Sequence, residues 1–218
     1  MFFLLARHCL CCQMRFKSQK PICVRCEQRL LRLTQHCITC GEWSRLESCE
    51  NCALNGTDLH RLYVSWNYSE PLKTLIHQFK FQHDLHLSHY LADLMIEHLP
   101  QRALETECLI PVPLHPQKLK QRGFHQTLLL AKAISKRLNI PISTQYCQKI
   151  QDTLPQMQLN RDERLFNLQT AFQCTRPPFA HITLIDDITT TGSTLKQLAR
   201  HFQASGIPCI DAWAIAKA

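Results

Sequence analysis

Two acidic residues, Asp186 and Asp187, directly follow the apolar run H-I-T-L-I and precede the hydroxyl-rich stretch I-T-T-T-G-S-T. Such a stretch at a helix N-terminus offers backbone N–H groups and hydroxyls to one anion, helped by the positive end of the helix dipole. Carboxylates repel phosphate, but they accept hydrogen bonds from sugar hydroxyls or act on hydrated Mg²⁺. The pattern therefore predicts one loop that holds both the diol of a ribose and its 5′-phosphate.

Two common nucleotide-binding motifs are absent from this sequence, because neither G-x-x-x-x-G-K-[ST] nor G-x-G-x-x-G occurs in it. The structural alternative for the loop is an ordinary strand–turn–helix connection with a capping threonine. That alternative explains one threonine or one aspartate, but it does not explain why two acids and several hydroxyl residues occur together around one glycine.

The cysteines form the second chemical pattern, since eight of the thirteen make four C-x-x-C pairs within the first 52 residues. Each pair can offer two thiolates to one tetrahedral ion, so the four pairs predict one or two zinc ions. A disulfide framework is disfavoured by the lack of a secretory signal, and an iron–sulfur cluster is the third alternative. The predicted zinc ligands are Cys9, Cys12, Cys23, Cys26, Cys37, Cys40, Cys49 and Cys52.

The spacing leaves the pairing of these motifs open. If the first C-x-x-C pair shares an ion with the second, and the third with the fourth, the result is two tandem zinc knuckles. If alternate pairs share an ion, the result is an interleaved, RING-like module. Cys11 lies inside the first pair and could replace Cys9 or Cys12. Because residues 1–56 contain few large apolar side chains, bound metal would supply much of the folding free energy of this predicted cysteine-rich zinc-finger module. The module could contact nucleic acid or protein, or act as a structural staple.

Residues 57–218 are predicted to form an α/β domain that positions the acidic loop. Apolar periodicity predicts strands at 62–68, 108–114 and 181–185, and helices at 69–81, 87–98, after 123 and from about 194. The 69–81 helix should bury one face made of Leu72, Leu75, Ile76 and Phe79. Its Lys73 and Lys80 are interpreted as solvated surface residues.

A basic segment is predicted to follow the 108–114 strand as a loop that passes through Gly123 into a long helix. Lys118, Lys120 and Arg122 come just past the carboxyl end of that strand, where ligands bind in open α/β sheets. The loop is either solvated surface or a wall of the ligand site. A polar segment, 153–172, is either a surface helix or a second loop over that site.

Composition excludes several classes of protein. The 218 residues are 45% hydrophobic and 19% charged, which is typical of a globular protein and not of a disordered, collagen-like or coiled-coil chain. No stretch reaches the roughly 18–20 apolar residues of a membrane-spanning helix, so we expect a cytoplasmic protein without membrane insertion. The net charge of +8 favours an anionic partner, either a phosphorylated small molecule or a nucleic acid.

The stretch L-I-D-D-I-T-T-T-G-S-T resembles the 5-phosphoribosyl-1-pyrophosphate (PRPP) signature of type I phosphoribosyltransferases. Together with the four C-x-x-C pairs, Y-S-E-P-L-K-T-L-I-H-Q-F-K-F and P-V-P-L-H-P-Q-K-L-K-Q-R-G-F-H-Q, the whole chain resembles the ComF family, which is linked to bacterial competence for natural transformation. One departure is His125, where the family usually has asparagine.

The resemblance implies a type I phosphoribosyltransferase-like fold with a mostly parallel sheet flanked by helices, and it implies roles for individual residues. Asp186 and Asp187 would bind the ribose hydroxyls, while Mg²⁺ would accompany PRPP. Arg122 would join the two acids as a catalytic residue. In the 153–167 segment, Gln156, Arg161 and Arg164 would close over the ligand. The remaining implied PRPP-binding residues are Thr190, Thr191, Gly192, Ser193, Thr194, Lys118 and Lys120.

Two functions remain open from the sequence. The first is a cytoplasmic ComF-like factor that binds PRPP or ribose 5-phosphate, incoming single-stranded DNA and proteins of the competence machinery. The second is a metabolic phosphoribosyltransferase that transfers phosphoribose to a small-molecule acceptor and has a purely structural zinc module.

Overall fold

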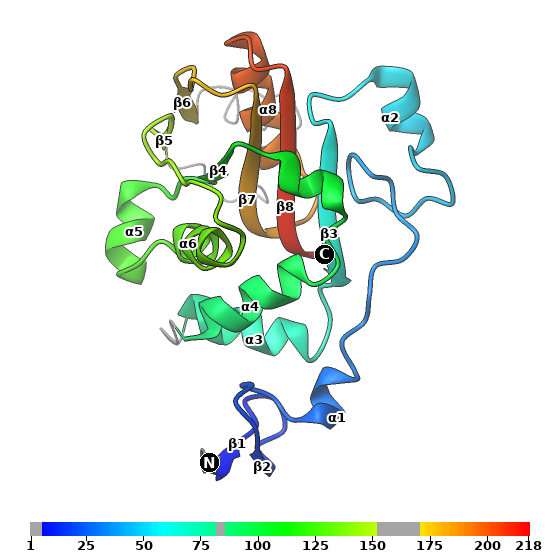
Figure 1. The fold of residues 1–218 in the computed structure, drawn as a ribbon, viewed down its shortest axis with the longest axis vertical. Helices are drawn as coiled ribbons and strands as arrows, with labels where there is room; N and C mark the ends of the chain where they lie inside the picture. The colour runs from blue at the N-terminus through cyan, green and yellow to red at the C-terminus, as the bar shows by residue number, and fades with distance from the viewer. Residues whose placement is uncertain (1–5, 82–85, 152–170) are drawn as a thin grey trace.

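The computed structural model describes residues 6–81, 86–151 and 171–218 (Figure 1). Its centre is a four-stranded sheet in the order β3-β8-β7-β4, in which every neighbouring pair is parallel. The predicted α/β fold with a mostly parallel sheet is therefore confirmed. The strands are β3 (Arg61–Asn67), β4 (Cys108–Pro111), β7 (His181–Thr189) and β8 (Cys209–Lys217).

Helices cover both faces of this sheet, which explains why its central strand is apolar on both sides. Ile182 and Leu184 of β7 pack in the core on the α8 face, while Ile185 packs in the core on the opposite face. One face carries α3 (Leu72–Phe81), α4 (Leu87–Ile96) and α6 (Gln126–Leu138), and the other carries α8 (Ser193–Ala204) (Figure 1).

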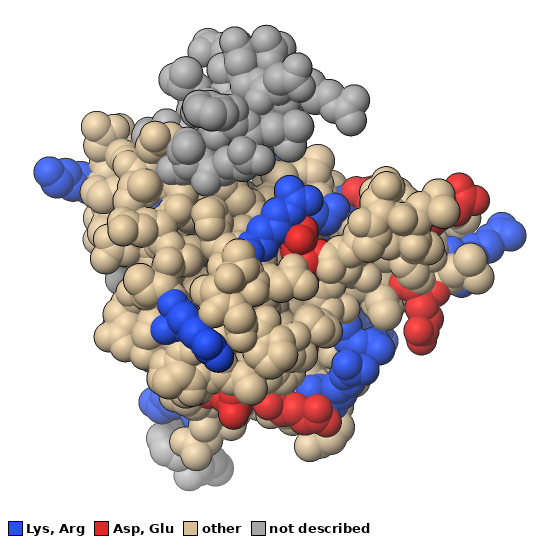
Figure 2. All heavy atoms as spheres, turned by 90° about the horizontal axis from the view of Figure 1, so that it is seen from above, with Lys and Arg blue, Asp and Glu red and all other residues tan. Residues whose placement is uncertain are grey.

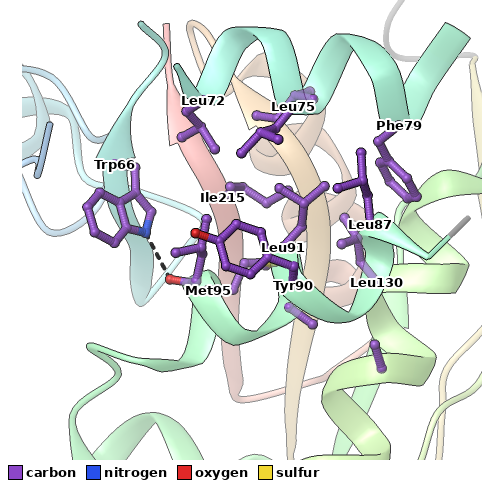
Figure 3. Close-up of a cluster of buried hydrophobic side chains, with 14 of the residues drawn as sticks. Trp66, Leu72, Leu75, Phe79, Leu87, Tyr90, Leu91, Met95, Leu130 and Ile215 are labelled. Atoms are coloured by element: carbon purple, nitrogen blue, oxygen red, sulfur yellow. Dashed lines mark hydrogen bonds between the residues drawn. The ribbon is translucent and has the colours of Figure 1, made fainter. Parts of the chain in front are cut away.

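The core beneath α3 and α4 is densely packed with large apolar side chains, as Figure 3 shows. The predicted buried face of α3 is confirmed, because Leu72, Leu75, Ile76 and Phe79 are all at most 1% exposed. Trp66 of β3 packs at the edge of this cluster, and its indole N–H donates to the Leu94 carbonyl over 2.9 Å. This hydrogen bond connects the edge strand β3 to α4.

Shorter elements complete the described chain. The N-terminal part has an antiparallel hairpin of β1 (Ala6–His8) and β2 (Arg15–Lys17), followed by α1 (Val24–Glu27) and α2 (Glu50–Asn55). Further along lie the 3₁₀ helix η1 (Gln101–Glu105), α5 (Pro116–Arg122) and the antiparallel pair β5 (Cys147–Lys149) and β6 (Phe172–Cys174). Within the described ranges, no helix has the length and apolar character needed to span a bilayer.

Two sequence-based interpretations are wrong in detail. The basic segment after β4 is the helix α5 and not a loop: Pro116 occupies its first turn, and Gly123 ends it at a φ of 72°. The second concerns β7, which continues to Thr189 because its backbone stays paired with β8 as far as Lys217. Asp186 and Asp187 therefore lie within the strand and not after its end.

Candidate functional site

The two adjacent acids of β7 point to opposite faces of the sheet, as neighbouring residues of a strand must. Asp187 is on the α3 face and has a side chain that is 6% exposed. Asp186 is on the α8 face and lines a hollow at the start of that helix. The carboxylates are held by the backbone, since Asp187 N–H donates to Asp186 Oδ1 over 2.8 Å and Ile188 N–H to Asp187 Oδ1 over 2.7 Å. The acid pair is thus rigid and divided between two environments.

Lys80 is the partner of Asp187, and its interpretation as a solvated surface residue is wrong. Its Nζ lies 2.9 Å from Asp187 Oδ2, and its side chain is only 17% exposed. The last turn of α3 brings the ammonium group over the strand, where it balances the charge of the buried carboxylate. Sequence periodicity places Lys80 outside the buried helix face, so only the tertiary structure reveals this role.

The hollow beside Asp186 has a volume of about 40 Å³ and is walled by the loop between β7 and α8. Gly192 precedes α8 with a φ of 68°, a conformation that strongly favours glycine. The first N–H groups of an α-helix lack intrahelical acceptors, so the start of α8 can offer N–H donors to the hollow. The lining residues are Asp186, Ile188, Thr189, Thr190, Gly192, Ser193, Thr194 and Leu195.

Thr189 is a lining residue that the sequence analysis missed. It is 3% exposed, and its hydroxyl oxygen is buried without a hydrogen-bond partner in the described part of the chain. A buried hydroxyl without a partner is costly, so a ligand atom in the hollow would relieve that cost. The first threonine of T-T-T-G-S-T was the available signal, but the predicted phosphate-binding residues began only at Thr190. Thr191, by contrast, is exposed, and its Oγ1 accepts a 3.4 Å hydrogen bond from Ser193 N–H.

Asp186 carries the strongest electrostatic perturbation of the candidate loop. Burial and then the neighbouring charge of Asp187 raise its pKa to about 7, although the Asp187 N–H bond and the charges of Lys80 and Lys149 act in the opposite direction. In the unfolded chain an aspartate titrates near pH 4. Between about pH 4 and pH 7 the folded protein therefore holds a proton that the unfolded chain releases, and the free energy of unfolding falls as the pH rises.

We expect Asp186→Asn to stabilise the ligand-free protein at pH 8, raising the melting temperature on the order of 5 °C. The asparagine oxygen can still accept the Asp187 N–H bond, while the buried charge is removed. The gain should shrink steadily toward pH 4, because the wild-type carboxyl is then protonated in the folded state and the unfolded chain begins to take up the same proton. Thermal melts from pH 4 to pH 8 measure this difference. Glu97→Gln, at a carboxylate whose side chain is 56% exposed, is the control and should show no such trend; an equal gain for Asp186→Asn at both ends of the range would contradict the assignment.

The basic helix α5 is connected to the acid pair through the end of α3. Phe81 of α3 stacks beneath the Arg122 guanidinium, with 5.5 Å from Cζ to the ring centroid, while its neighbour Lys80 contacts Asp187. Lys118 and Arg122 are four residues apart and share one side of α5, whereas Lys120 is exposed and lies on the other side. The structure therefore separates the three predicted cations into a pair on one side and one residue on the opposite side.

His125, which departs from the expected asparagine, acts as the N-cap of α6. Its Nδ1 accepts a hydrogen bond from the Leu128 N–H over 3.1 Å, as an asparagine side chain at an N-cap would. Burial lowers the pKa of His125, which keeps the imidazole neutral and able to accept. The substitution therefore preserves a helix cap. Gln156, Arg161 and Arg164, which are predicted to close over the ligand, lie outside the described residues.

The eight paired cysteines form two separate clusters, one from the first two pairs and one from the last two, so sequential pairing holds. In each cluster the four sulfur atoms all lie within 4.8 Å of one another. The distances Cys12 Sγ to Cys23 Sγ and Cys40 Sγ to Cys49 Sγ are both 3.7 Å. Zinc with Zn–S bonds of about 2.3 Å in a tetrahedron requires sulfurs about 3.8 Å apart, so both clusters fit a zinc ion.

Cys11 does not belong to the first cluster, because its thiol points to the Pro71 carbonyl oxygen, 3.7 Å away. The doubt about which cysteines form that site is thereby removed. Burial acts to raise the pKa of Cys9, but backbone N–H groups of Cys12, Cys23 and Cys11 donate to its sulfur and lower the pKa to about 6. Burial also acts to raise the pKa of Cys37, but hydrogen bonds from backbone N–H groups lower it to about 6. Each cluster thus contains a thiol that readily becomes a metal-binding thiolate.

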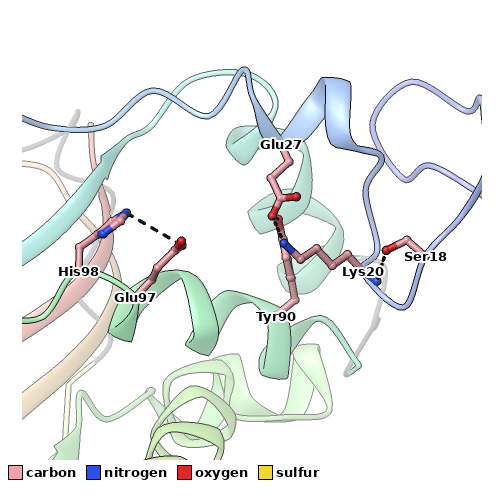
Figure 4. A network of polar contacts seen from close by, with 6 residues as sticks. All are labelled: Ser18, Lys20, Glu27, Tyr90, Glu97 and His98. Atoms are coloured by element: carbon pink, nitrogen blue, oxygen red, sulfur yellow. Dashed lines mark hydrogen bonds and ion pairs between the residues drawn. The ribbon is translucent and has the colours of Figure 1, made fainter.

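The first cluster is anchored to the main core through several contacts with α3 and α4. Tyr90 of α4 donates to Glu27 Oε1 over 3.4 Å, and Lys20 pairs with the same oxygen at 2.5 Å (Figure 4). Gln78 of α3 donates to the Leu10 carbonyl over 3.1 Å. The second cluster lies near β3, where Leu62 N–H donates to the Ile38 carbonyl over 2.6 Å. The two cysteine clusters therefore attach to different parts of the sheet domain.

The positive net charge does not form one continuous basic surface on the face seen in Figure 2. Lys and Arg side chains on that face are scattered among uncharged residues and next to acidic ones. A nucleic acid on this face would meet separate cationic points and not a basic stripe.

Several bacterial proteins are similar to this chain along most of its length. Competence protein F of Haemophilus influenzae is 30% identical over 98% of this chain and 93% of its own length. DNA utilization protein YhgH of Salmonella typhimurium is 27% identical, covering 96% of both chains. Competence protein ComFC of Bacillus subtilis is 26% identical over 84% of this chain and 78% of its own. No protein-family model matches the chain.

Proposed function

Because the chain belongs to the competence protein F (ComF) family, we propose that it binds PRPP, or a related ribose phosphate, at the loop that follows β7. We further propose that it acts in the cytoplasm on single-stranded DNA taken up during natural transformation, together with proteins of the competence machinery. The names of its relatives, which are competence proteins and DNA utilization proteins, support the link to DNA.

The observation that carries the ribose-phosphate proposal is the combination of the Asp186 carboxylate, several hydroxyls and a helix terminus around one hollow, with Asp187 next to it on the other face of β7. Asp186 and Asp187 would accept hydrogen bonds from the ribose hydroxyls. Backbone N–H groups at the start of α8 would hold the 5′-phosphate, as helix N-termini do for many anions. The hydroxyl of Thr189 adds a donor whose hydrogen bond is otherwise unmade. The residues that would contact the phosphate are Thr190, Thr191, Gly192, Ser193 and Thr194.

If phosphoribose is transferred, the reaction is a displacement at the anomeric carbon, through a sugar that acquires positive charge. The two acids would orient that sugar, and Lys80 would fix the Asp187 carboxylate in place. Lys118 and Arg122, on one side of α5, would face the pyrophosphate, whereas Lys120 could reach it only from the other side of the helix. Mg²⁺, when bound with PRPP near the acids, would neutralise charge on the departing pyrophosphate.

A metabolic phosphoribosyltransferase with a structural zinc module is the second candidate, and one observation favours it. Cys9, Cys23 and Cys26 of the first cluster pack within the main hydrophobic core and leave little cysteine surface free for a partner. We keep residues 1–56 as the proposed zinc module and residues 57–218 as the proposed phosphoribosyltransferase-like domain. In this alternative the acceptor is a small molecule, and DNA has no effect on ligand binding.

Isothermal titration of the zinc-loaded protein with PRPP and Mg²⁺, with and without a single-stranded oligonucleotide, tests both candidates. One PRPP site, together with oligonucleotide binding that weakens steeply with salt, is the expected result. PRPP binding without any DNA binding at low salt would favour the metabolic enzyme. An absence of heat with PRPP at millimolar concentration would overturn the ribose-phosphate proposal, and pyrophosphate alone serves as the control ligand.

A further inference from the structure

A group of buried polar atoms without partners lies on the α3 and α4 face of the sheet, away from the candidate ligand loop. Thr183 and Asp211 are register partners on β7 and β8, and they are 0% and 2% exposed. Tyr63 and Trp213 form the next such pair, between β3 and β8. In the described part of the chain no hydrogen bond reaches Thr183 Oγ1, Asp211 Oδ1, Tyr63 Oη or Trp213 Nε1. Buried polar atoms without partners at neighbouring register positions on one face call for a bound water or ion.

Three residues with metal-binding side chains surround the same place. His181 and Cys209 are the first residues of β7 and β8 and lie directly opposite each other in the sheet. Asp211 is two residues further along β8, so its side chain is on the same face as that of Cys209. One ring nitrogen of His181, the Cys209 sulfur and one carboxylate oxygen of Asp211 all lie within 4.8 Å of one another.

Within the described ranges, the Asp211 carboxylate has a partner for only one of its two oxygens. Its Oδ2 is 3.0 Å from His181 Nε2, and the carboxylate side chain is 3% exposed. Its second oxygen, Oδ1, has no partner among the described residues. A buried carboxylate with one unsatisfied oxygen is costly, and coordination to a divalent ion removes that cost. The oxygen therefore distinguishes this cluster from a simple histidine–aspartate pair.

The ligand set selects the kind of ion. Imidazole, thiolate and carboxylate together suit Zn²⁺, whereas Mg²⁺ and Ca²⁺ prefer oxygen ligands alone. Zinc bonds of about 2.0–2.3 Å place ligand atoms about 3.3–3.8 Å apart in a tetrahedron, so the three side chains need only small shifts. Glu107 fixes the start of β7 nearby, because its carboxylate accepts the N–H groups of Ala180 and His181 over 2.5 and 2.9 Å.

We propose that His181, Cys209 and Asp211 bind a third zinc ion, separate from the two four-cysteine clusters and at the opposite end of β7 from the ribose-phosphate loop. The ion joins the beginnings of the two central strands. Its fourth coordination position takes a water molecule, for which the Thr183 and Tyr63 hydroxyls on the same face are hydrogen-bonding groups. The His181 side chain is 15% exposed, which gives the ion a route from solvent.

Metal content of the purified chain tests this site independently of PRPP or DNA. After exchange with excess Zn²⁺ and desalting, elemental analysis should find three zinc ions per wild-type chain. Cys209→Ser and His181→Gln should each lower the content to two. Cys174→Ser, at a cysteine outside all three clusters, is the matched control and should retain three. Two ions in the wild type would overturn the proposal and leave a histidine–aspartate pair with ordered water.

The spectrum of the cobalt-substituted protein gives a second readout that does not depend on the stability of any one variant. The wild-type minus Cys209→Ser difference spectrum should show Co²⁺ with a single thiolate ligand, whose sulfur-to-metal absorption is weaker than that of a four-cysteine site because one thiolate contributes in place of four. Asp211→Asn should shift this difference spectrum. A wild-type spectrum identical to that of folded Cys209→Ser would contradict the proposal even if the total metal content were three.

Discussion

Replacing Asp187 with asparagine is expected to weaken the binding of Mg²⁺ and PRPP by about 100-fold or more, which corresponds to about 2.7 kcal/mol. The Asp187 carboxylate is held in one orientation by Lys80 Nζ at 2.9 Å and by the Ile188 N–H at 2.7 Å. A sugar hydroxyl that donates to such a preorganised charged acceptor loses a strong, charge-assisted hydrogen bond in the variant. Isothermal titration of the folded variant measures the change.

The control for this prediction must separate lost binding from lost folding, since Asp187→Asn leaves the partly buried Lys80 without its partner. Removing one member of a buried ion pair destabilises a protein more than removing both. The double variant Lys80→Met with Asp187→Asn should therefore regain stability but not PRPP affinity. Asp58→Asn removes an acid that pairs with the exposed Arg200 on α8, and it should bind PRPP normally. A folded Asp187→Asn protein with affinity within about threefold of wild type would refute the role of this acid.

The sequence predicted those parts of the site that are local in the chain. The acid pair, the loop and the first turn of α8 lie within ten residues, so residue types and helix-end chemistry were enough to place them together. Similarly, the two residues between the cysteines of each pair form a tight turn, which brings both sulfur atoms to the same side of that turn. Which two C-x-x-C pairs share a cluster could not be predicted, because the segments between the pairs permit both sequential and alternate pairing.

Contacts between distant segments could not be predicted in the same way. Lys80 is polar and lies beside the apolar face of its helix, and only the packing of α3 over β7 brings it to Asp187. The helix α5 was missed because its short, basic sequence has no apolar stripe, although the proline and glycine at its ends are typical helix boundaries. His181 and Cys209 are far apart in the chain and adjacent only through strand register.

Replacing Cys26 with serine is expected to lower the melting temperature of the whole protein on the order of 10 °C and to remove one zinc ion. Cys26 is 3% exposed and packs in the same hydrophobic cluster as α3, α4 and α6. Losing the ion frees the segment that carries Leu10 and Glu27, whose contacts with Gln78 and Tyr90 join this cluster to α3 and α4. Melting curves and elemental analysis of the purified variant give both quantities.

Cys52→Ser is the matched variant, because Cys52 has the same role in a cluster that packs apart from the main core. It should also lose one zinc ion, but it should lower the melting temperature by about half as much or less. The released segment would chiefly expose the edge strand β3, which it contacts through Leu33 and Ile38. Equal destabilisation by the two substitutions would show that both clusters support the core to the same degree. The expected asymmetry instead makes the first four-cysteine cluster part of the main core and the second a separate attachment to β3.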